Sequence, residues 1–445
     1  MLAPLAQAYV RAVKPGEQAD FHRDLLGVVL RRVQRSYALD VDAAALVKEA
    51  LTAIEPVALH SGDPLEVFNK AMNAALASLD PHSRYLDAHA QLNERNSLTG
   101  SFGGLGLEVD SIDGLVRVVA SMPATPAARA GLQRGDLIVR FDDQPVLGMG
   151  LGEAISRMRG QPGTPITLTI RRTGVEDEFT ISLVRETIHI QPVRWSMEGD
   201  VLVLRLASFT RSVTTALERA ISEAVSAQMP RAVVLDMRGN GGGLLREAVT
   251  VADAFLSEGT IASLRGRAPG NRRSWQADAS EYFPGTPMVV LIDGRSASAA
   301  ELVAAALQEN GRATVMGQRS FGKGSVQSII SLGGENGALR LTTALYHGPS
   351  GRTVQRTGVG PDIELVAAAD PNARPGRREA DRSHALPGAD EPQPSKARVD
   401  QARCPMPRKE LDPVLACALA FIDAGAIDTF VATLEPAESV ALPAQ

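Results

Sequence analysis

Residues 288–309 read MVVLIDGRSASAAELVAAALQE, and this stretch decides the fold class. It opens with MVVLI, an apolar and mostly β-branched run without polar alternation, as expected of a strand buried on both faces. A turn that contains glycine leads from this run into the helical pattern ASAAELVAAALQE. A second unit of the same kind lies upstream, where RAVVLDM (231–237) precedes the helical pattern LLREAVTVADAFL (244–256). Repeated strand–turn–helix units predict an α/β domain, which we place at residues 188–365.

The turn in this stretch places serines at the start of the helix. A serine in that position lies beside backbone N–H groups that are free to face a developing oxyanion. The plainer interpretation is that Ser296 and Ser298 only cap the helix. A Ser-His-Asp triad has little support, because there is no GxSxG motif and no His and Asp at a recognisable spacing nearby. A Ser-Lys dyad needs neither partner and performs the same chemistry.

One lysine has two opposed interpretations. Residues 317–325 read GQRSFGKGS and match all but the last position of a phosphate-binding P-loop. Such a loop needs a helix after it, whereas SVQSIISL is typical of a strand, and Gly324 stands where a hydroxyl would hold magnesium. We therefore expect no nucleotide. Apolar Phe321 and Val326, and the absence of any acid within six residues, favour burial of Lys323 as a neutral amine that can act as a general base.

Composition excludes several other functions. The chain has 445 residues, enough for two to four domains. Its 46 basic and 51 acidic residues give a net charge of −5, so neither nucleic acid nor an anionic membrane is expected as a partner. Two cysteines without a CxxC pair and seven histidines without an HExxH motif predict no metal, and no cofactor is expected. A Cys404–Cys417 disulfide and two free buried thiols are equal alternatives.

The rest of the chain divides by the texture of its sequence. Residues 1–98 predict a helical region, and residues 99–187 mix short strands with one short helix, which predicts a compact second module. Residues 366–403 are rich in Pro, Ala, Arg and Asp and predict a disordered linker. Residues 404–445 predict a C-terminal helical segment. The terminal helices could build a homodimer, and a monomer with docked helices fits equally well.

Six motifs together resemble one protein family. Their order and spacing are similar to those of the carboxyl-terminal processing proteases, or tail-specific proteases, which are serine peptidases with a Ser-Lys dyad and a PDZ domain. The resemblance implies a crotonase-like or ClpP-like α/β core with an inserted PDZ domain, a partly open β-barrel with helices, at residues 99–187. The motifs are DPHSRYL (80–86), FGGLG (102–106), VLDMRGNGGGLL (234–245), DGRSASAAELVAAALQENGRA (293–313), GQRSFGKGSVQ (317–327) and YHGPSGRTVQRTGVGPDI (346–363).

The resemblance also assigns catalytic roles. The family nucleophile falls on Ser298, and the general base falls on Lys323, twenty-five positions later. Gln327 matches the glutamine that orients the base by hydrogen bonding. The oxyanion donors fall on the backbone N–H groups of Ala299 and Gly242, where a glycine lets the backbone approach the substrate carbonyl closely.

The chain departs from the family pattern in three places. The glycine-rich turn at residues 239–243 reads GNGGG instead of NNPGG, Ala300 replaces a serine, and Glu309 replaces an aspartate. Loss of the proline should loosen the unliganded oxyanion hole without removing a donor. Ala300 is not at the nucleophile position, and we expect the change at Glu309 to be tolerated. Because no catalytic group is lost, we expect an active enzyme.

The strand-rich module carries the implied peptide-binding site. FGGLG resembles the loop whose N–H groups cradle the C-terminus of a bound polypeptide, and such a peptide would add to the strand GLEVD (106–110). Arg159 matches an arginine thought to sense substrate. Asp80 and His82 are expected to be hinge and packing residues instead of catalysts. The remaining candidates for the peptide site, whose four apolar members fit ordinary core positions equally well, are Gly104, Leu105, Gly106, Leu107, Ile155 and Met158.

These observations lead to one functional hypothesis and two rivals. The hypothesis is a serine endopeptidase that captures apolar C-termini of proteins or peptides through its PDZ domain and cleaves by a Ser-Lys dyad. The sequence does not decide whether an adaptor protein is a further partner. The family implies a periplasmic location. MLAPLAQAYV lacks the features of a signal peptide, so a cytoplasmic location is the alternative. The rivals are an inactive PDZ scaffold, which predicts a missing Ser, Lys or Gln, and a crotonase-type acyl-thioester enzyme, which leaves the PDZ module unexplained.

Overall fold

The computed structural model of the protein describes residues 2–112, 114–189, 191–278, 280–334, 336–366, 376–389, 391, 393–406 and 411–434. The polypeptide divides into two compact units, Met1–Leu92 with Pro192–Gln445, and Asn93–Gln191. The second unit is inserted in sequence between the two parts of the first. It contains the predicted module at 99–187 and is a few residues longer at each end.

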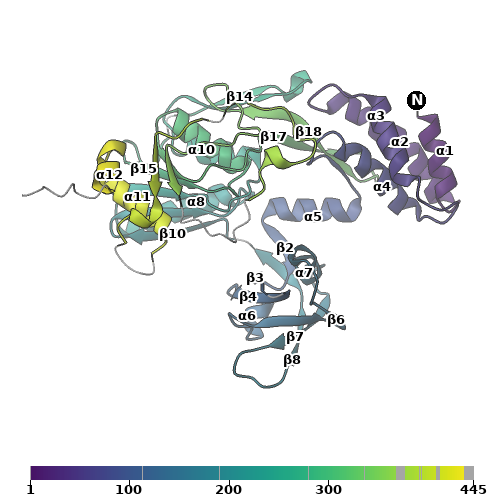
Figure 1. The fold of residues 1–445 in the computed structure, drawn as a ribbon, viewed down its shortest axis with the longest axis horizontal. Helices are drawn as coiled ribbons and strands as arrows, with labels where there is room; N and C mark the ends of the chain where they lie inside the picture. Colours follow the sequence, from purple (N-terminus) through teal and green to yellow (C-terminus); the bar gives the residue numbers. More distant parts are fainter. Residues whose placement is uncertain are drawn as a thin grey trace, which may run out of the picture. The chain divides into compact units, whose positions relative to one another are not determined.

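A seven-stranded sheet forms the centre of the first unit (Figure 1). Its order is β10-β11-β12-β15-β16-β19-β20, and every neighbouring pair is parallel except β10 and β11. All residues of β12 and β15 are buried, as their apolar runs predict, and the α/β prediction is confirmed. The strands are β10 (Val193–Glu198), β11 (Val201–Leu206), β12 (Ala232–Asp236), β15 (Met288–Ile292), β16 (Thr314–Gly317), β19 (Ile363–Val366) and β20 (Ala397–Asp400).

Helices cover both faces of this sheet. Leu235 and Val290 share one apolar cluster with α8, α9 and α10, whereas Val234 and Leu291 share another with α11 and α12. Successive residues of one strand therefore face different helices, which is why these strands show no polar alternation. The helices are α8 (Val213–Ala227), α9 (Leu245–Asp253), α10 (Ala299–Glu309), α11 (Pro413–Ala424) and α12 (Ile427–Leu434).

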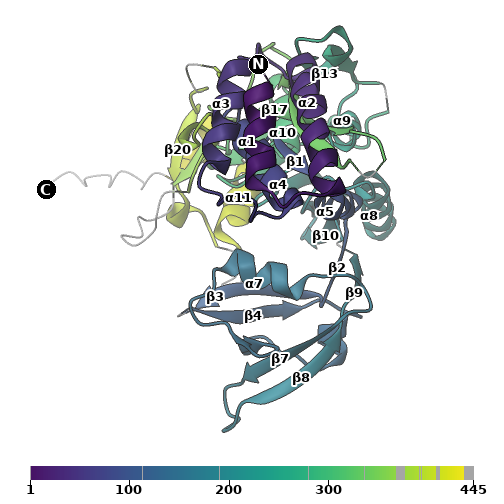
Figure 2. The same ribbon diagram turned by 90° about the vertical axis from the view of Figure 1, so that its right-hand side faces the viewer.

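A second sheet connects this core to the N-terminal helices. Its longest strand, β18, pairs with β1, β13 and β17. Leu339 and Leu341 of β18 enter the apolar cluster of α1–α4, and Tyr346 of the same strand enters the cluster of α8, α9 and α10. Figure 2 shows α1, α2 and α3 lying side by side. The elements are α1 (Ala3–Ala12), α2 (Glu17–Ser36), α3 (Ala43–Ile54), α4 (Pro64–Ala77), β1 (Arg84–Leu86), β13 (Thr260–Arg265), η1 (Pro269–Asn271), β14 (Arg273–Gln276), β17 (Ser325–Ser331) and β18 (Ala338–His347).

The segment after Lys323 decides the phosphate question. β17 begins two residues beyond the lysine and pairs with β18 along its whole length. A P-loop requires a helix at this place, because the helix N-terminus helps to hold the phosphate. The observed strand agrees with the sequence prediction and contradicts the P-loop interpretation.

The linker prediction for residues 366–403 is wrong over most of the part that the structure describes. β20 adds to the main sheet beside β19, and the short helix η2 (Glu379–Asp381) contains a fully buried Glu379. Leu386 packs into the N-terminal cluster. The prediction from composition is wrong here because this segment has few large apolar residues. Backbone pairing and a few hydrogen-bonded side chains keep it ordered instead. Residues 367–375 lie outside the described part.

The C-terminal helical segment packs on the main sheet, and a disulfide joins Cys404, which follows η3 (Gln401–Arg403), to Cys417 of α11. Both terminal helical segments thus lie against the protein's own sheets, as in the alternative of a docked monomer. No single helix in the described ranges is long and apolar enough to cross a membrane. The α11–α12 pair reaches that length and composition only together, with a bend of 117°.

The second unit is built on a six-stranded antiparallel sheet. Among the described residues, its strand β3 pairs only with β4 in this sheet and so lies at an edge. A separate two-stranded sheet joins β2 to β9, and α5 spans the boundary with the first unit. The elements are α5 (Ala88–Thr99), β2 (Ser101–Gly104), β3 (Leu107–Ile112), β4 (Leu115–Ser121), α6 (Pro126–Arg129), β5 (Leu137–Phe141), β6 (Gln144–Pro145), α7 (Leu151–Met158), β7 (Pro165–Arg171), β8 (Phe179–Val184) and β9 (Glu186–His189).

Candidate active site

Ser298 lies at the N-cap of α10, at the end of the turn that follows β15. Its backbone has φ +56° and ψ −113°, a conformation that non-glycine residues rarely adopt and that clusters at functional sites. The backbone is held on both sides: its N–H donates to Glu301 Oε2 at 2.7 Å, and its carbonyl accepts from Tyr346 Oη at 3.0 Å. Ser296 is fully buried and donates from Oγ to the Met237 carbonyl at 2.9 Å, so it braces the turn.

The glycine-rich turn after β12 lies against this serine. A Cβ added at Gly242 would stand 2.9 Å from Ser298 Cβ and 3.0 Å from Ala299 N, and φ there is +100°, so only glycine fits. Ala299 is the first residue of α10, and its N–H therefore has no partner within the helix. The Gly242 N–H donates to Asn240 Oδ1 at 2.9 Å. Of the two predicted oxyanion donors, one is thus engaged by a neighbouring side chain.

Lys323 and Gln327 lie together beside β18. Lys323 Nζ donates to Gln327 Oε1 at 2.6 Å and to the Ser325 carbonyl at 2.9 Å. A neutral amine has two N–H groups and one lone pair, so these two acceptors leave the lone pair for a third direction. The pKa of Lys323 is lowered to about 8, first by burial and then by the charge of Arg340, while the charges of Glu379, Glu301 and Asp80 act in the opposite direction.

A buried series of hydrogen bonds holds Gln327 in this orientation. Its Nε2 donates to Thr342 Oγ1 at 3.1 Å, and Thr342 Oγ1 donates to Asp80 Oδ1 at 3.1 Å. Asp80, fully buried, also accepts from Ser83 Oγ at 2.6 Å. Asp80 therefore supports, through Thr342, the glutamine that contacts Lys323. His82 Nε2 lies 2.9 Å from Glu379 Oε1. His82 lines the same cavity as Lys323, although the two residues are far apart in the sequence.

Glu301, which the sequence analysis did not single out, connects the two halves of the site. The carboxyl of Glu301 is fully buried and accepts four hydrogen bonds. Oε1 accepts from Ser320 Oγ at 2.5 Å and Gly322 N at 2.6 Å, and Oε2 accepts from Ser298 N at 2.7 Å and Lys323 N at 2.8 Å. Burial raises the pKa of Glu301, and these four bonds act in the opposite direction. Because all four partners donate, the arrangement fits the ionised carboxylate.

Ser298 and Lys323 share an anchor without a direct contact between their side chains. Among the described residues no hydrogen bond joins the Ser298 side chain to Lys323 Nζ, yet both backbone N–H groups donate to the same oxygen of Glu301. The sequence did contain a signal for this carboxylate, because Glu301 is the one charged residue in an otherwise apolar stretch at residues 299–307. A charge on a buried helix face is retained where it has partners.

The family-derived peptide site in the second unit is partly core. Leu105 and Met158 are buried, whereas Leu107 and Ile155 are half-buried and pack against the same cluster. The Leu105 carbonyl accepts from Ala127 N at 3.0 Å, so the loop is fixed to α6. Of these four, Leu107 and Ile155 retain exposed surface for a ligand.

The loop FGGLG and the arginine at the end of α7 meet in this unit. Arg159 places its guanidinium 4.6 Å from the centre of the Phe102 ring. Gly106 has φ +77°, and a Cβ there would come within 2.3 Å of Thr125. A Cβ at Gly104 would come within 2.9 Å of Phe102. The glycines of this loop are thus required by close packing.

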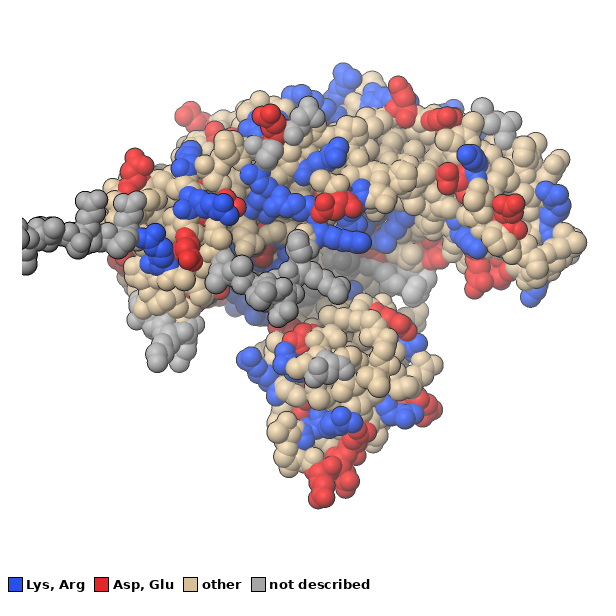
Figure 3. Space-filling model, viewed as in Figure 1, with Lys and Arg blue, Asp and Glu red and all other residues tan. Residues whose placement is uncertain are grey.

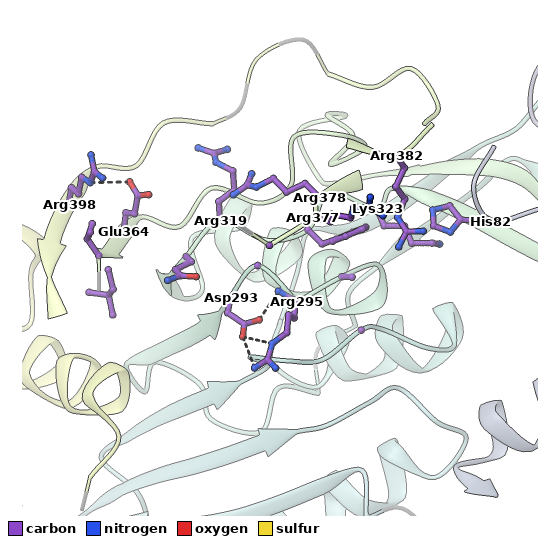
Figure 4. Close-up of a pocket in the computed structure, with 18 residues that line it drawn as sticks. His82, Asp293, Arg295, Arg319, Lys323, Glu364, Arg377, Arg378, Arg382 and Arg398 are labelled. Carbon is purple, nitrogen blue, oxygen red and sulfur yellow. Dashed lines mark hydrogen bonds and ion pairs between the residues drawn. The ribbon is translucent and has the colours of Figure 1, made fainter. Parts of the chain in front are cut away.

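A cavity of about 930 Å³ in the first unit adjoins the predicted catalytic residues (Figure 4). Gly241, Ala297 and Lys323 line it. Gly241 and Ala297 directly precede Gly242 and Ser298 in the sequence, and Lys323 is itself a predicted catalytic residue. Within the part of the protein that the structure describes, no three His, Cys, Asp or Glu side chains are placed to hold a metal ion.

Known proteins resemble this one over both units. Peptidase family S41 matches residues 200–365, and a PDZ domain matches residues 117–172. A carboxy-terminal-processing protease of Bartonella bacilliformis is 47% identical over 305 residues, covering 68% of this chain and 70% of that protein. The chloroplastic C-terminal processing peptidase of Tetradesmus obliquus is 32% identical over 324 residues, covering 68% of each. The solved photosystem II D1 C-terminal processing protease is 27% identical with a TM-score of 0.50, covering 77% of this chain and 93% of that one. The chain therefore belongs to peptidase family S41, the carboxy-terminal processing proteases, and is a serine peptidase with a PDZ domain.

Proposed function

We propose that Ser298 is the nucleophile and Lys323 the general base of an endopeptidase that acts through an acyl-enzyme. The observation that carries the proposal is the placement of Lys323, whose burial favours the neutral amine and whose N–H groups meet two acceptors. Gln327 keeps that amine oriented. All three residues that an inactive scaffold should have lost are present.

The steps follow acyl-transfer chemistry. Ser298 Oγ bonds to the scissile carbonyl carbon while its proton passes to Lys323 Nζ. The oxyanion accepts hydrogen bonds from the Ala299 and Gly242 N–H groups, as the C–N bond breaks and the leaving amine takes the proton from Lys323. Water then attacks the acyl-enzyme with Lys323 again as base, which releases the acid and restores Ser298. Because Asn240 Oδ1 accepts from Gly242 N–H, it must share or release this donor when the oxyanion forms.

The rate of cleavage should follow the protonation of Lys323. A base must be neutral, so kcat/KM is expected to rise with pH and level off above a pKa of about 8. Below that pKa each pH unit should lower kcat/KM about tenfold. The measurement is cleavage of a quenched fluorescent peptide between pH 6 and 10 without ATP. A flat profile, or one that falls over this range, would contradict a lysine base.

The PDZ unit is proposed to capture apolar C-termini at the edge of β3. Support comes from the unpaired edge of that strand and from the half-buried Ile155 on α7. Binding of a labelled peptide with an apolar free C-terminus, measured by anisotropy in Ser298→Ala protein, is expected to weaken about tenfold in the additional variant Ile155→Ser.

The matched control for this binding measurement is Val175→Ser, on the turn between β7 and β8, where the valine is exposed. It should leave the Kd unchanged. Equal Kd values for the Ile155 variant and its parent would rule out α7 as a wall of the peptide site.

We further propose that the protein works in an oxidising compartment such as the periplasm. The Cys404–Cys417 disulfide supports this, because such bonds persist where thiols are not kept reduced. The test is to unfold the unreduced protein and treat it with a thiol-alkylating reagent. Cysteines that the disulfide protects from alkylation agree with the proposal, and alkylation of both thiols refutes it.

A further inference from the structure

The cavity beside the catalytic residues lies where open α/β sheets bind ligands. Three of its walls follow the carboxyl ends of β12, β15 and β16, and a fourth comes from β19 and the segment at 376–382. In parallel sheets these ends form a crevice that receives ligands. The occupant of this cavity would lie next to Ser298, because Ala297 and Gly241 line it.

The cavity is strongly positive although the whole protein is negative. Six arginines line it, against the two carboxylates of Asp293 and Glu364. Figure 3 shows Lys and Arg side chains gathered on this body, over β15, α10 and β17. The arginines are Arg295, Arg319, Arg377, Arg378, Arg382 and Arg398.

The two carboxylates are already paired at the rim. Asp293 lies 3.4 Å from the exposed Arg295, and Glu364 lies 3.8 Å from the exposed Arg398. Glu379, which lies 3.8 Å from Arg382, is bound to His82. Among the described residues these acidic groups therefore form no ion pair with the remaining arginines of the cavity.

Three of the lining arginines have no carboxylate paired with their side chains among the described residues. Arg319 donates to backbone carbonyls, those of Thr357 and Gln393. Burial lowers the pKa of Arg319 and repulsion from Arg378 lowers it further, while the charge of Glu364 acts in the opposite direction. The other two are Arg377 and Arg378. Figure 4 shows Arg319, Arg378 and Arg377 in a row that leads toward Lys323.

These arginines do not serve to tune the base. The arginine that depresses the pKa of Lys323 is Arg340, which is not in the cavity lining, and the other charges acting on the lysine are Glu379, Glu301 and Asp80. A cleft lined by one sign of charge instead concentrates ligands of the opposite sign. Arginine binds carboxylates in particular through paired N–H groups.

We propose that this cavity is a subsite for a carboxylate of the polypeptide being cleaved, either an acidic side chain near the scissile bond or the free C-terminus. The proposal rests on the proposed cleavage at Ser298, because that function makes a polypeptide the occupant. It assigns the core a charge preference of its own, separate from the apolar preference of the PDZ unit.

The test uses three peptides with one apolar C-terminus that carry Glu, Gln or Lys on both sides of the cleaved bond. Wild-type protein is expected to cleave the Glu peptide with a kcat/KM roughly tenfold above that of the Gln peptide, the size of one charge-assisted hydrogen bond. Arg378→Gln should remove this difference, and Arg378→Glu should reverse the order in favour of the Lys peptide. A misfolded variant cannot produce such a reversal. Arg32→Gln, at an exposed position on α2, should keep the wild-type order.

Two further arms separate the sources of the carboxylate and the two proposals. A Gln peptide with an amidated C-terminus identifies the free C-terminus as the ligand if its loss of kcat/KM depends on Arg378. Binding of the Glu and Gln peptides to Ser298→Ala protein measures the charge preference even if cleavage fails. The subsite would be overturned by a Glu preference that survives both Arg378 variants. It would also be overturned by equal Kd and kcat/KM for all three peptides together with an effect of amidation that does not depend on Arg378.

Discussion

Replacing Lys323 by alanine is expected to lower kcat/KM for peptide cleavage by at least about a thousandfold at every pH from 6 to 10. The variant loses the group proposed to accept the Ser298 proton, and within the described residues no titratable side chain hydrogen-bonds to the side chain of that serine. The free energy of unfolding should change little. Burial of the amine opposes folding, as its pKa of about 8 shows, and the alanine variant no longer has this cost. Peptide cleavage and the thermal unfolding midpoint are the two measurements.

Lys323→Arg separates a base from a fixed positive charge. Arginine keeps the charge and can still donate to Gln327, but it cannot lose its proton at these pH values. If Lys323 acts as a base, the arginine variant should be as inactive as the alanine variant. Substantial activity in Lys323→Arg would show that the site needs a cation and not a base. Lys70→Ala, at an exposed position on α4, is the matched control and should match wild type.

Replacing Glu301 by glutamine is expected to cost both activity and stability. The amide would offer an NH2 group to at least one of four donors, leaving buried N–H groups unpaired, which lowers the free energy of unfolding by about 2–4 kcal/mol. Ser298 and Lys323 would lose their common anchor, so kcat should fall roughly a hundredfold. Denaturant unfolding and peptide cleavage measure the two effects.

A shift in the pH profile distinguishes this role from simple structural support. The negative charge of Glu301 raises the pKa of Lys323, so its removal should move the midpoint of kcat/KM to lower pH, while Arg340, Glu379 and Asp80 are unchanged. Loss of stability alone would leave the midpoint in place. Glu49→Gln, on an exposed face of α3, should affect neither quantity. An unmoved midpoint with normal kcat would refute the anchoring role.

The core of the fold was predictable because its signal is local. A strand buried on both faces and a helix that follows it reveal themselves within about twenty residues, as MVVLIDGRSASAAELVAAALQE does. The strand after Lys323 was predictable for the same reason, from the β-branched run SVQSIISL.

The features that were missed depend on contacts between distant segments. Glu301 accepts hydrogen bonds from residues that follow β16, about twenty positions later in the sequence. Glu379 hydrogen-bonds with His82 and Gln355, which also lie far from it in the sequence. The residues next to each glutamate in the sequence do not predict these partners. The choice between a Cys404–Cys417 bridge and free thiols likewise needed the docking of α11 on the sheet. Asn240 could be read as a turn residue, but not as the group that occupies the Gly242 N–H.

Strand β18 connects the N-terminal helices to the candidate active site. Leu339 and Leu341 of this strand pack among α1–α4. Thr342 Oγ1 accepts a hydrogen bond from Gln327, and Tyr346 Oη donates one to the Ser298 carbonyl. One strand thus belongs to two cooperative units that could otherwise open separately. The consequence is that loosening of the helical bundle is transmitted along β18, so amide exchange in the bundle and exchange around the nucleophile should share one opening free energy. Proteolytic activity should then report whether the helices α1–α4 remain folded.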